Sequence, residues 1–343
     1  MIGHSNAGKT TYMSSMYALG RAGIRGGFRI RTRNPAQEAE LLRHAEEIRR
    51  GTYPPPSAQR TTYDFVLRHR RRDFFDFTWS DYRGGALLDR STEADTTALL
   101  EDLQGADGIV VFADAHALLS DRNAPRQLRR LTVLLQRSVG EATRQIPLVI
   151  VYTKADLIPA DPEVWTKIKE PLAAIATAAN SGERIIATDI EVSCGKAPRN
   201  VEVPLLWCLG NVLADKVISL EKDLAQSRAD AKRYQADSGI GDSISSWWNS
   251  VPSYAKMAED ARKDAKKERA ELAPLKGPVK SLTKALVRYH PAGSEIVNAQ
   301  RTTLRATASA RRAADTVEVG RAVLVVLIFV VVFGGFLLFA FSL

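Results

Sequence analysis

Apolar residues in the first two hundred positions fall into short runs that are typical of β-strands. Two continuous runs, GIVVFADA at residues 108–115 and PLVIVYTKAD at 147–156, predict central strands covered on both faces. The segments 61–67 and 74–80 are rich in aromatic and β-branched residues, and the basic turn RHRRRD between them predicts a hairpin. A further strand is expected at 185–193.

Helical patterns separate these strands. Residues 93–105, 124–139 and 163–180 are expected to form helices. In the second of them the apolar residues recur on one face, namely Leu128, Leu131, Leu135 and Val139. Because strands alternate with helices, the pattern predicts a three-layer α/β domain with a mostly parallel sheet, to which the early hairpin is the exception.

The character of the chain changes after residue 201. An apolar helix at 201–220 is expected to close the domain and to continue as a charged helix that leaves it. A break at 238–254 precedes a second, strongly charged helix at 258–272. We therefore expect an α/β domain over residues 1–215 and a helical stalk over 216–320.

An uncharged apolar segment occupies residues 322–343. As a helix it would span roughly 33 Å, against about 30 Å for the hydrocarbon core of a bilayer. Arginines are frequent just before it, which favours a cytoplasmic location for the preceding residues. We expect a transmembrane helix over 321–343, so that the chain is a single-pass, tail-anchored membrane protein with its N-terminal domain in the cytoplasm.

Charge and cysteine content add little to this picture. The formal net charge of +9 suits an anionic membrane surface, although charge alone does not identify a partner. The basic turn between the hairpin strands lacks interleaved aromatic residues for base stacking, so we expect no specific nucleic-acid partner. The two cysteines, Cys194 and Cys208, have neither metal-ligand spacing nor a disulfide framework, which suits a reducing compartment.

The chain opens with GHSNAGKT, which fits the pattern G-x-x-x-x-G-K-[ST] of a phosphate-binding loop. In such a loop, backbone N–H groups and the N-terminus of the following helix face the phosphates. Lys9 is expected to reach the β- and γ-phosphates, and the Thr10 hydroxyl is expected to bind Mg²⁺.

Three further short motifs follow at strand ends. D-x-x-G places Asp81 where it would hold the metal through water and Gly84 where its N–H would meet the γ-phosphate. In TKAD, Asp156 would accept hydrogen bonds from the donor pair on the guanine edge, while the Lys154 stem would lie over the base. The SCGK motif ends the last strand and would approach the base from its other side.

Together, GHSNAGKT, DYRG, TKAD and SCGK resemble the Ras-like (TRAFAC-class) P-loop GTPases over residues 1–215. The opening motif also resembles double-GTPase-like proteins encoded beside bacterial conflict systems. The resemblance implies a catalytic set of Lys9, Asn6, Thr62 and Gly84, and a metal set of Thr10, Asp81 and Thr62. The implied nucleotide-binding residues are Gly3, Asn6, Ala7, Gly8, Lys9, Thr10, Thr11, Thr153, Lys154, Asp156, Ser193, Cys194 and Gly195.

Several positions leave alternatives open. Asn6 matches the residue that helps hold K⁺ in potassium-stimulated GTPases, or it simply tolerates the backbone conformation of the loop. Either Thr61 or Thr62 is the expected switch threonine that binds Mg²⁺. Gly85 stands where many Ras-like enzymes have a glutamine that orients water, so we expect slow intrinsic hydrolysis.

The strand before the phosphate loop is conspicuously short. Met1 and Ile2 alone precede Gly3, and two residues cannot fill a central strand of a parallel sheet without leaving its neighbours unpaired. We expect that the natural protein begins several apolar residues upstream of Met1.

These observations predict a membrane-anchored GTPase that binds GTP or GDP with Mg²⁺ and switches an unidentified protein effector at the cytoplasmic membrane face. A nucleotide-binding scaffold with little hydrolysis is the first alternative. A dynamin-like membrane-remodelling GTPase, which would involve self-association, is the second.

Overall fold

The structure, a computed structural model, describes residues 1–55, 60–81, 93–140, 145–173, 185–238 and 253–287. These residues belong to one compact unit, Met1–His290. The apolar segment 322–343, expected to span a membrane, lies outside the described residues.

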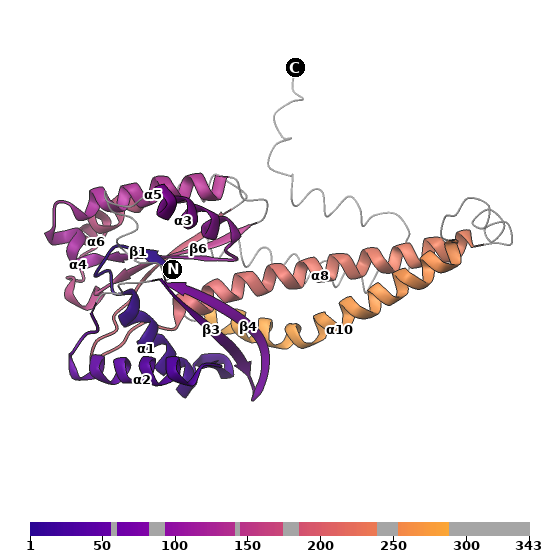
Figure 1. Cartoon of the computed structure of the whole chain (residues 1–343), viewed down its shortest axis with the longest axis horizontal. Coiled ribbons are helices and arrows are strands. Elements are labelled where there is room, and N and C mark those ends of the chain that lie inside the picture. The colour runs from indigo at the N-terminus through magenta and orange to yellow at the C-terminus, as the bar shows by residue number, and fades with distance from the viewer. Residues whose placement is uncertain (56–59, 82–92, 141–144, 174–184, 239–252, 288–343) are drawn as a thin grey trace, which may run out of the picture. The chain divides into compact units, whose positions relative to one another are not determined.

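A four-stranded parallel sheet forms the centre of the molecule, in the order β1-β5-β6-β7 (Figure 1). Its strands are β1 (Ile2–Gly3), β5 (Ile109–Asp114), β6 (Ile146–Thr153) and β7 (Ile185–Glu191). All eight residues of β6 are buried, as expected for a strand covered on both faces. The structure thus confirms the mostly parallel α/β fold and the three later strands.

The predicted hairpin is confirmed, but it belongs to a second sheet. The strands β2 (Phe28–Thr32), β3 (Thr61–His69) and β4 (Arg72–Asp81) form an antiparallel sheet in that order. Sequence analysis did not predict β2, which pairs with β3 along its whole length. Among the described residues, no strand ladder joins the two sheets.

Helices cover both faces of the parallel sheet. One face packs against α3 (Glu93–Gly105), α5 (Ala124–Gly140) and α6 (Pro162–Lys169) in a continuous apolar core. On the other face the ring of Tyr12, from α1 (Lys9–Ala22), lies 5.0 Å from that of Phe112. The other helices among the described residues before the stalk are α2 (Pro35–Arg50), α4 (Ala115–Ser120) and three short 3-10 turns, η1 (Arg25–Gly27), η3 (Ala155–Leu157) and η4 (Glu170–Leu172).

The helix expected at 163–180 is interrupted in its described part. The α-helix α6 ends at Lys169, and the chain continues as the 3-10 turn η4, which contains Pro171. Pro171 has no N–H to donate to the carbonyl of Lys167, which interrupts the α-helical hydrogen bonds although Glu170 keeps α-helical dihedral angles. Residues 174–180 lie outside the described part of the chain.

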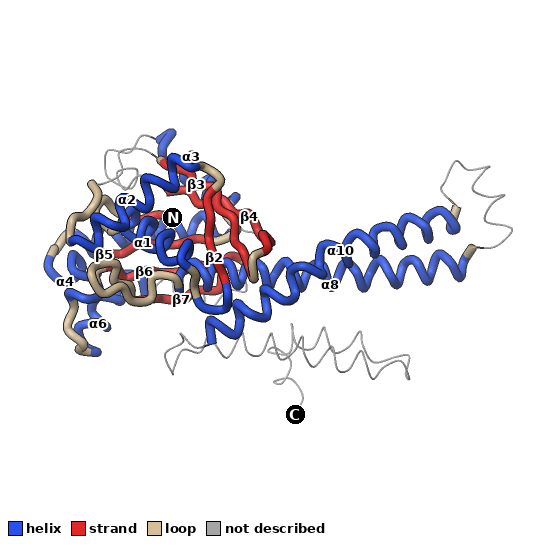
Figure 2. The backbone as a smooth tube through the Cα atoms, turned by 90° about the horizontal axis from the view of Figure 1, so that it is seen from below, coloured by secondary structure: helices blue, strands red, loops and turns tan. Residues whose placement is uncertain are grey.

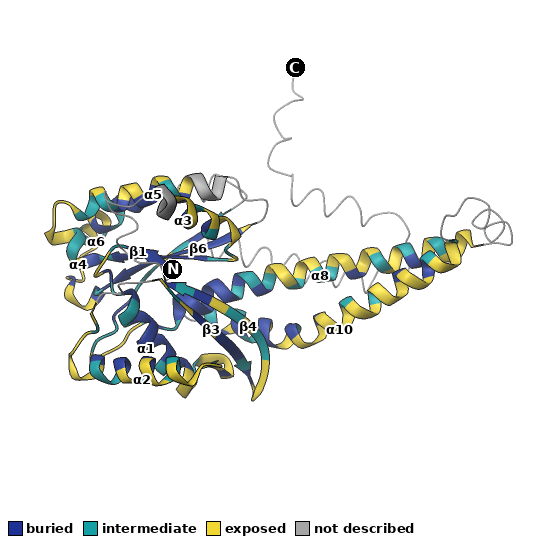
Figure 3. Ribbon diagram, viewed as in Figure 1, coloured by how far each residue is buried: buried dark blue, intermediate teal, exposed yellow. Residues whose placement is uncertain are grey.

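Two long helices, α8 (Val203–Asp237) and α10 (Tyr254–Val287), pack along each other as an antiparallel hairpin (Figure 2). An ion pair between Lys276 and Glu221 at 2.9 Å and stacked rings of Tyr234 and Tyr254 join them. The first turns of α8 are buried in the domain, and its later turns alternate between buried and exposed positions (Figure 3). Among the described helices, α8 is long and apolar enough to cross a membrane, but half of its most apolar window is buried inside the protein.

The structure leaves the expected domain boundaries untested. The helix α8 passes through residue 215 without interruption, and the end of α10 returns to the domain, where it packs against η1. The helical hairpin and the α/β domain therefore share a continuous backbone and a packing contact.

Candidate nucleotide-binding site

The phosphate-loop motif connects β1 to α1 at the carboxyl edge of the parallel sheet. Gly8 caps α1 with φ of 79°, and Asn6 has φ of 65°, both in the left-handed region that non-glycine residues rarely adopt. Asparagine is among the few side chains that tolerate this region, so backbone conformation accounts for Asn6. Its proposed contact with K⁺ stays a prediction.

Gly3 lies closer to the neighbouring strand than any side chain would allow. A Cβ atom on Gly3 would lie 2.6 Å from the carbonyl oxygen of Phe112 on β5. Close packing against β5 therefore explains why the first residue of the motif is a glycine.

Lys9 is buried beneath the phosphate loop. Its ammonium donates hydrogen bonds to the carbonyl oxygens of Gly3 at 2.9 Å and His4 at 3.1 Å. Burial lowers the pKa of Lys9, while the carboxylate of Asp81, which is itself buried at the end of β4, acts to raise it. A buried cation next to exposed loop amides is suited to an anionic ligand.

A cavity of about 500 Å³ opens above this loop. Four segments that are far apart in the sequence line it: the loops after β1, β6 and β7, and the segment after α2 that contains Tyr53. The predicted nucleotide-binding residues among its walls are Asn6, Ala7, Gly8, Lys9, Thr10, Thr11, Thr153, Lys154, Asp156, Cys194 and Gly195. Two predicted residues, Gly3 and Ser193, do not line it.

Thr153 ties the loop after β6 to the phosphate loop. Its hydroxyl lies within hydrogen-bonding distance of the carbonyl oxygens of Ala7, at 3.0 Å, and Ala113, at 3.3 Å. The next residue, Lys154, has φ of 57° and forms an ion pair at 2.5 Å with Asp114, the last residue of β5. These contacts hold the backbone that presents Asp156 to the cavity.

The loop after β7 forms the opposite wall. Cys194 and Gly195 line the cavity, and the carboxylate of Asp156 lies 4.0 Å from the place of a Cβ on Gly195. Burial raises the pKa of Cys194 to about 12, so its thiol is protonated at neutral pH. Ser193 is buried in the turn itself, where its hydroxyl donates to the carbonyl of Ala197 at 3.3 Å.

The proposed metal ligands are only partly brought together. Thr10 lines the cavity, and Asp81 is near enough to Lys9 to affect its pKa. A hydroxyl and a buried carboxylate are oxygen donors that fit Mg²⁺, which completes its shell with phosphate and water oxygens. Thr62 lies within β3, is exposed and does not line the cavity, and Gly84 lies outside the described residues.

Several residues at the site are not among the predicted nucleotide-binding residues. Tyr53 lines the cavity with Pro54 and Pro55, and its hydroxyl is 3.3 Å from the place of a Cβ on Gly195. Asp114 was read as part of an apolar strand, although an acidic residue at the carboxyl end of such a strand is a signal for a site. For Tyr53 the available signal was the proline run that follows it, at residues 54–56.

Comparisons with family models and with solved structures found matches. A family model described as Double-GTPase 2 matches residues 1–200. No curated protein matches the chain. Among solved structures, the "Signal recognition particle receptor SRb-GTP/SRX complex" from Chaetomium thermophilum matches with 16% identity and a TM-score of 0.35, over 59% of this chain and 93% of that chain. The family match supports GTP binding and covers more than half of the sequence, and the chain belongs to the Double-GTPase 2 family.

Proposed function

We propose that the protein is a membrane-anchored GTP-binding switch that hydrolyses GTP slowly and controls a protein partner at the cytoplasmic membrane face. The observation that carries this proposal is the convergence of the phosphate loop, the TKAD loop and the SCGK loop on one cavity of about 500 Å³. A cavity of this size, lined by a buried lysine and by a carboxylate, suits a nucleotide.

Each end of the cavity would recognise a different part of the ligand. The backbone N–H groups at the start of α1 and the Lys9 ammonium would bind the phosphates. The Asp156 carboxylate would accept hydrogen bonds from guanine, and adenine lacks the donor pair that satisfies it. Thr10 and Asp81 would hold Mg²⁺, which neutralises charge on the phosphates when it is bound.

The switch itself would involve the segment that contains Asp81 and Gly84. A hydrogen bond from the Gly84 N–H to the γ-phosphate would fix this segment in one conformation, and loss of the γ-phosphate would release the segment. Gly85 has no side chain to orient water, which supports slow hydrolysis without a partner. The apolar residues 322–343 support attachment to a membrane.

The substitution Asp156→Asn tests the base assignment. An asparagine should pair with xanthine better than with guanine, so the variant should lose at least tenfold in GTP affinity and gain at least tenfold for xanthosine triphosphate. Both affinities can be measured by fluorescence titration of the full chain in detergent. Asp161→Asn is the matched control, because Asp161 caps α6 and does not line the cavity. Retention of the GTP preference by the Asp156 variant would overturn the assignment.

A second measurement separates the switch from a scaffold. Single-turnover phosphate release should be slow but measurable for the switch, and the substitution Lys9→Ala should abolish it. Equal release from the Lys9 variant and the original chain, with GDP retained, would favour a nucleotide-binding scaffold. Comparison of sodium and potassium buffers in the same assay tests the role of Asn6.

A further inference from the structure

The antiparallel sheet concentrates positive charge at one end. The turn between β3 and β4 consists of Arg70 and Arg71, and Arg72 begins β4. These three residues, the turn arginines, are all exposed. In the adjacent pair of strands, Arg29 of β2 lies directly opposite Arg68 of β3, and like charges in that position destabilise a sheet.

Acidic side chains neutralise only part of this charge. Asp73 forms an ion pair with Arg68. The turn arginines and Arg29 form no ion pair with an acidic residue in the part of the chain that the structure describes. This end of the sheet therefore has an excess of positive charge.

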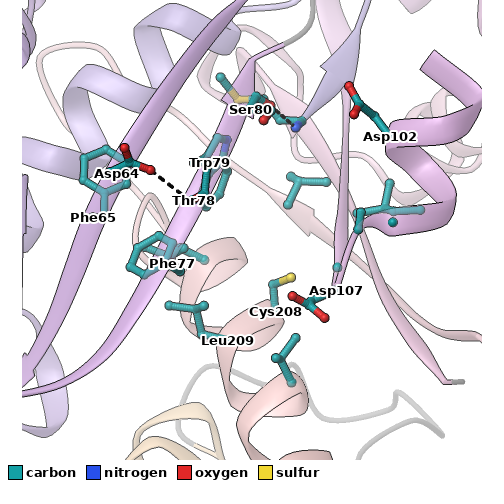
Figure 4. A pocket seen from close by; sticks show the side chains of 18 of the residues that line it. Asp64, Phe65, Phe77, Thr78, Trp79, Ser80, Asp102, Asp107, Cys208 and Leu209 are labelled. Atoms are coloured by element: carbon teal, nitrogen blue, oxygen red, sulfur yellow. Dashed lines mark hydrogen bonds between the residues drawn. The ribbon is translucent and has the colours of Figure 1, made fainter. Parts of the chain in front are cut away.

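Toward its other end, the same sheet has balanced charges. Figure 4 shows Asp64 of β3, whose carboxylate accepts a hydrogen bond from the Thr78 hydroxyl of β4 at 2.9 Å. Two residues before Thr78, the carboxylate of Asp76 forms an ion pair with Arg33 at 2.9 Å. The excess of positive charge is thus confined to the end that carries the turn.

The backbone of this turn is unfavourable for arginine. Arg70 has φ of 48° and Arg71 has φ of 71°. Two-residue hairpin turns with positive φ at both positions strongly favour Asn-Gly, because a larger side chain meets steric repulsion in the left-handed region. Arginine at both positions therefore costs stability, which favours a role for these charges outside the fold itself.

The end of α10 lies beside the same turn. The N–H of Arg70 donates to the carbonyl oxygen of Gly27 in η1 at 3.3 Å. A Cβ on the neighbouring Gly26 would lie 3.4 Å from the Cβ of Ala285, in the last turn of α10. The exposed Lys284 adds a further positive charge there. The chain therefore leaves α10 next to the turn arginines.

The sequence that follows α10 has the same sign of charge and leads to the apolar segment. Residues 288–321 contain six arginines and three acidic residues, and the uncharged residues 322–343 come next. Under the proposed function these apolar residues are inserted in a membrane. The chain would then connect that membrane to the end of the domain where the turn lies.

We propose that Arg29, Arg70, Arg71, Arg72 and Lys284 form a basic rim that binds the headgroups of anionic lipids in the membrane to which the chain is attached. This inference rests on the proposed membrane attachment. Anionic headgroups supply the acidic partners that the rim lacks among the described residues, and arginine binds phosphate through two parallel N–H donors. Each arginine or lysine near an anionic bilayer strengthens association by about fivefold.

Nucleic acid is the other polyanion that basic residues could bind. Base stacking on a protein requires accessible aromatic rings. The rings beside the rim, Phe28 and Phe74, pack against the buried His69, with ring centroids 4.7 Å and 6.4 Å away. These contacts and the position of the end of α10 favour lipid headgroups.

Chemical footprinting of the full chain tests this proposal. The protein is reconstituted in vesicles of phosphatidylcholine, either alone or with about one-third phosphatidylserine, and modification of its arginines by phenylglyoxal is followed by mass spectrometry. Arg70, Arg71 and Arg72 should react at least about fivefold more slowly in the anionic vesicles. The exposed Arg122 and Arg126, at the start of α5, are internal controls and should react equally in both.

A double variant separates lipid binding from the stability of the hairpin. Arg70→Asn with Arg71→Gly gives the turn the residues that its φ angles favour, so the thermal midpoint should rise by about 2–4 °C. Because two rim charges are lost, the protection of Arg72 in anionic vesicles should fall by at least about threefold. Arg122→Gln with Arg126→Gln is the matched control, and it should leave the protection of the turn unchanged.

The outcomes distinguish this inference from the proposed membrane attachment. A chain that floats with the vesicles in a density gradient, but whose turn arginines react equally in both lipids, would overturn the basic rim alone. A chain that floats with neither kind of vesicle would overturn both. Equal protection of the turn by duplex DNA, with the chain in detergent at the same ionic strength, would also overturn the inference, because the rim would then bind nucleic acid.

Discussion

The hydroxyl of Thr153 lies 3.0 Å from the carbonyl oxygen of Ala7, a hydrogen bond that spans 146 residues of sequence. Both groups are buried, so the bond fixes the loop after β6 against the phosphate loop. Because these loops would bind the base and the phosphates respectively, we expect Thr153 to act as a positioning residue for the whole nucleotide.

The substitution Thr153→Val removes this bond and keeps the shape of the side chain. The carbonyl of Ala7 loses its donor, so we expect the free energy of unfolding to fall by about 1–3 kcal/mol. GTP affinity should fall by about tenfold, since the two loops are no longer held in register. Urea unfolding and fluorescence titration measure the two effects.

Thr132→Val is the matched control for this change. Thr132 is also buried, but its hydroxyl donates to the carbonyl of Leu128 within α5, away from the cavity. The control should lower stability without weakening GTP binding. If both variants bind GTP equally well, Thr153 does not position the loops.

Asp114 and Lys154 form a second link at the site, at 2.5 Å. The carboxylate is largely buried and also caps α4 by accepting from the N–H of Ala117. Asp114→Asn keeps an acceptor for the cap but removes the charge, so stability should change by less than about 1 kcal/mol. GTP affinity should fall by about threefold to tenfold, because Lys154 is freed from its position.

The same titration checks this prediction against Asp121→Asn. Asp121 is exposed and its side chain accepts from the N–H of Asn123, outside the cavity. Unchanged binding by the Asp114 variant would mean that Lys154 is positioned by the ligand alone.

Much of the parallel sheet was predictable from the sequence because its strands are buried on both faces. The runs that became β5 and β6 are continuously apolar, and their motifs lie where parallel strands end, at one edge of the sheet. Because of that geometry, the sequence predicts that Lys9 and Asp156 line one cavity, and the prediction does not require the conformation of the loops between them.

Other features depend on tertiary contacts that no local pattern reveals. The strand β2 reads FRIRT, whose alternation is too short to distinguish from a loop, and it is defined by pairing with β3. Tyr53 lines the cavity because the segment after α2 folds back toward the phosphate loop, and no local pattern predicts that course of the chain. Ser193 belongs to the SCGK motif, but its side chain stabilises the turn after β7, because its hydroxyl donates a hydrogen bond to the carbonyl oxygen of Ala197.

Two glycine substitutions should have opposite effects on stability. Gly3→Ala would place a Cβ atom 2.6 Å from the Phe112 carbonyl, which forces β1 away from β5, and we expect a loss of at least about 2 kcal/mol. Gly105→Ala lies in the last turn of α3, where a Cβ would meet nothing within 4 Å, and should stabilise by up to about 1 kcal/mol. Urea unfolding of both variants checks the pair, and a destabilised Gly105 variant would contradict the helical geometry.

The buried thiols predict a loss of stability at high pH. Burial raises the pKa values of Cys194 and Cys208 from about 9 to about 12, so above pH 9 the unfolded chain loses thiol protons that the folded chain keeps. Stability is therefore full below pH 9 and falls as pH rises toward 12, by about 1 kcal/mol per thiol at pH 10. Cys208→Ala removes one titrating group, so its unfolding free energy should fall less steeply than that of the original chain between pH 8 and 10. Equal slopes in urea unfolding would show that the Cys208 thiol reaches water, and that α8 does not seal this side of the domain.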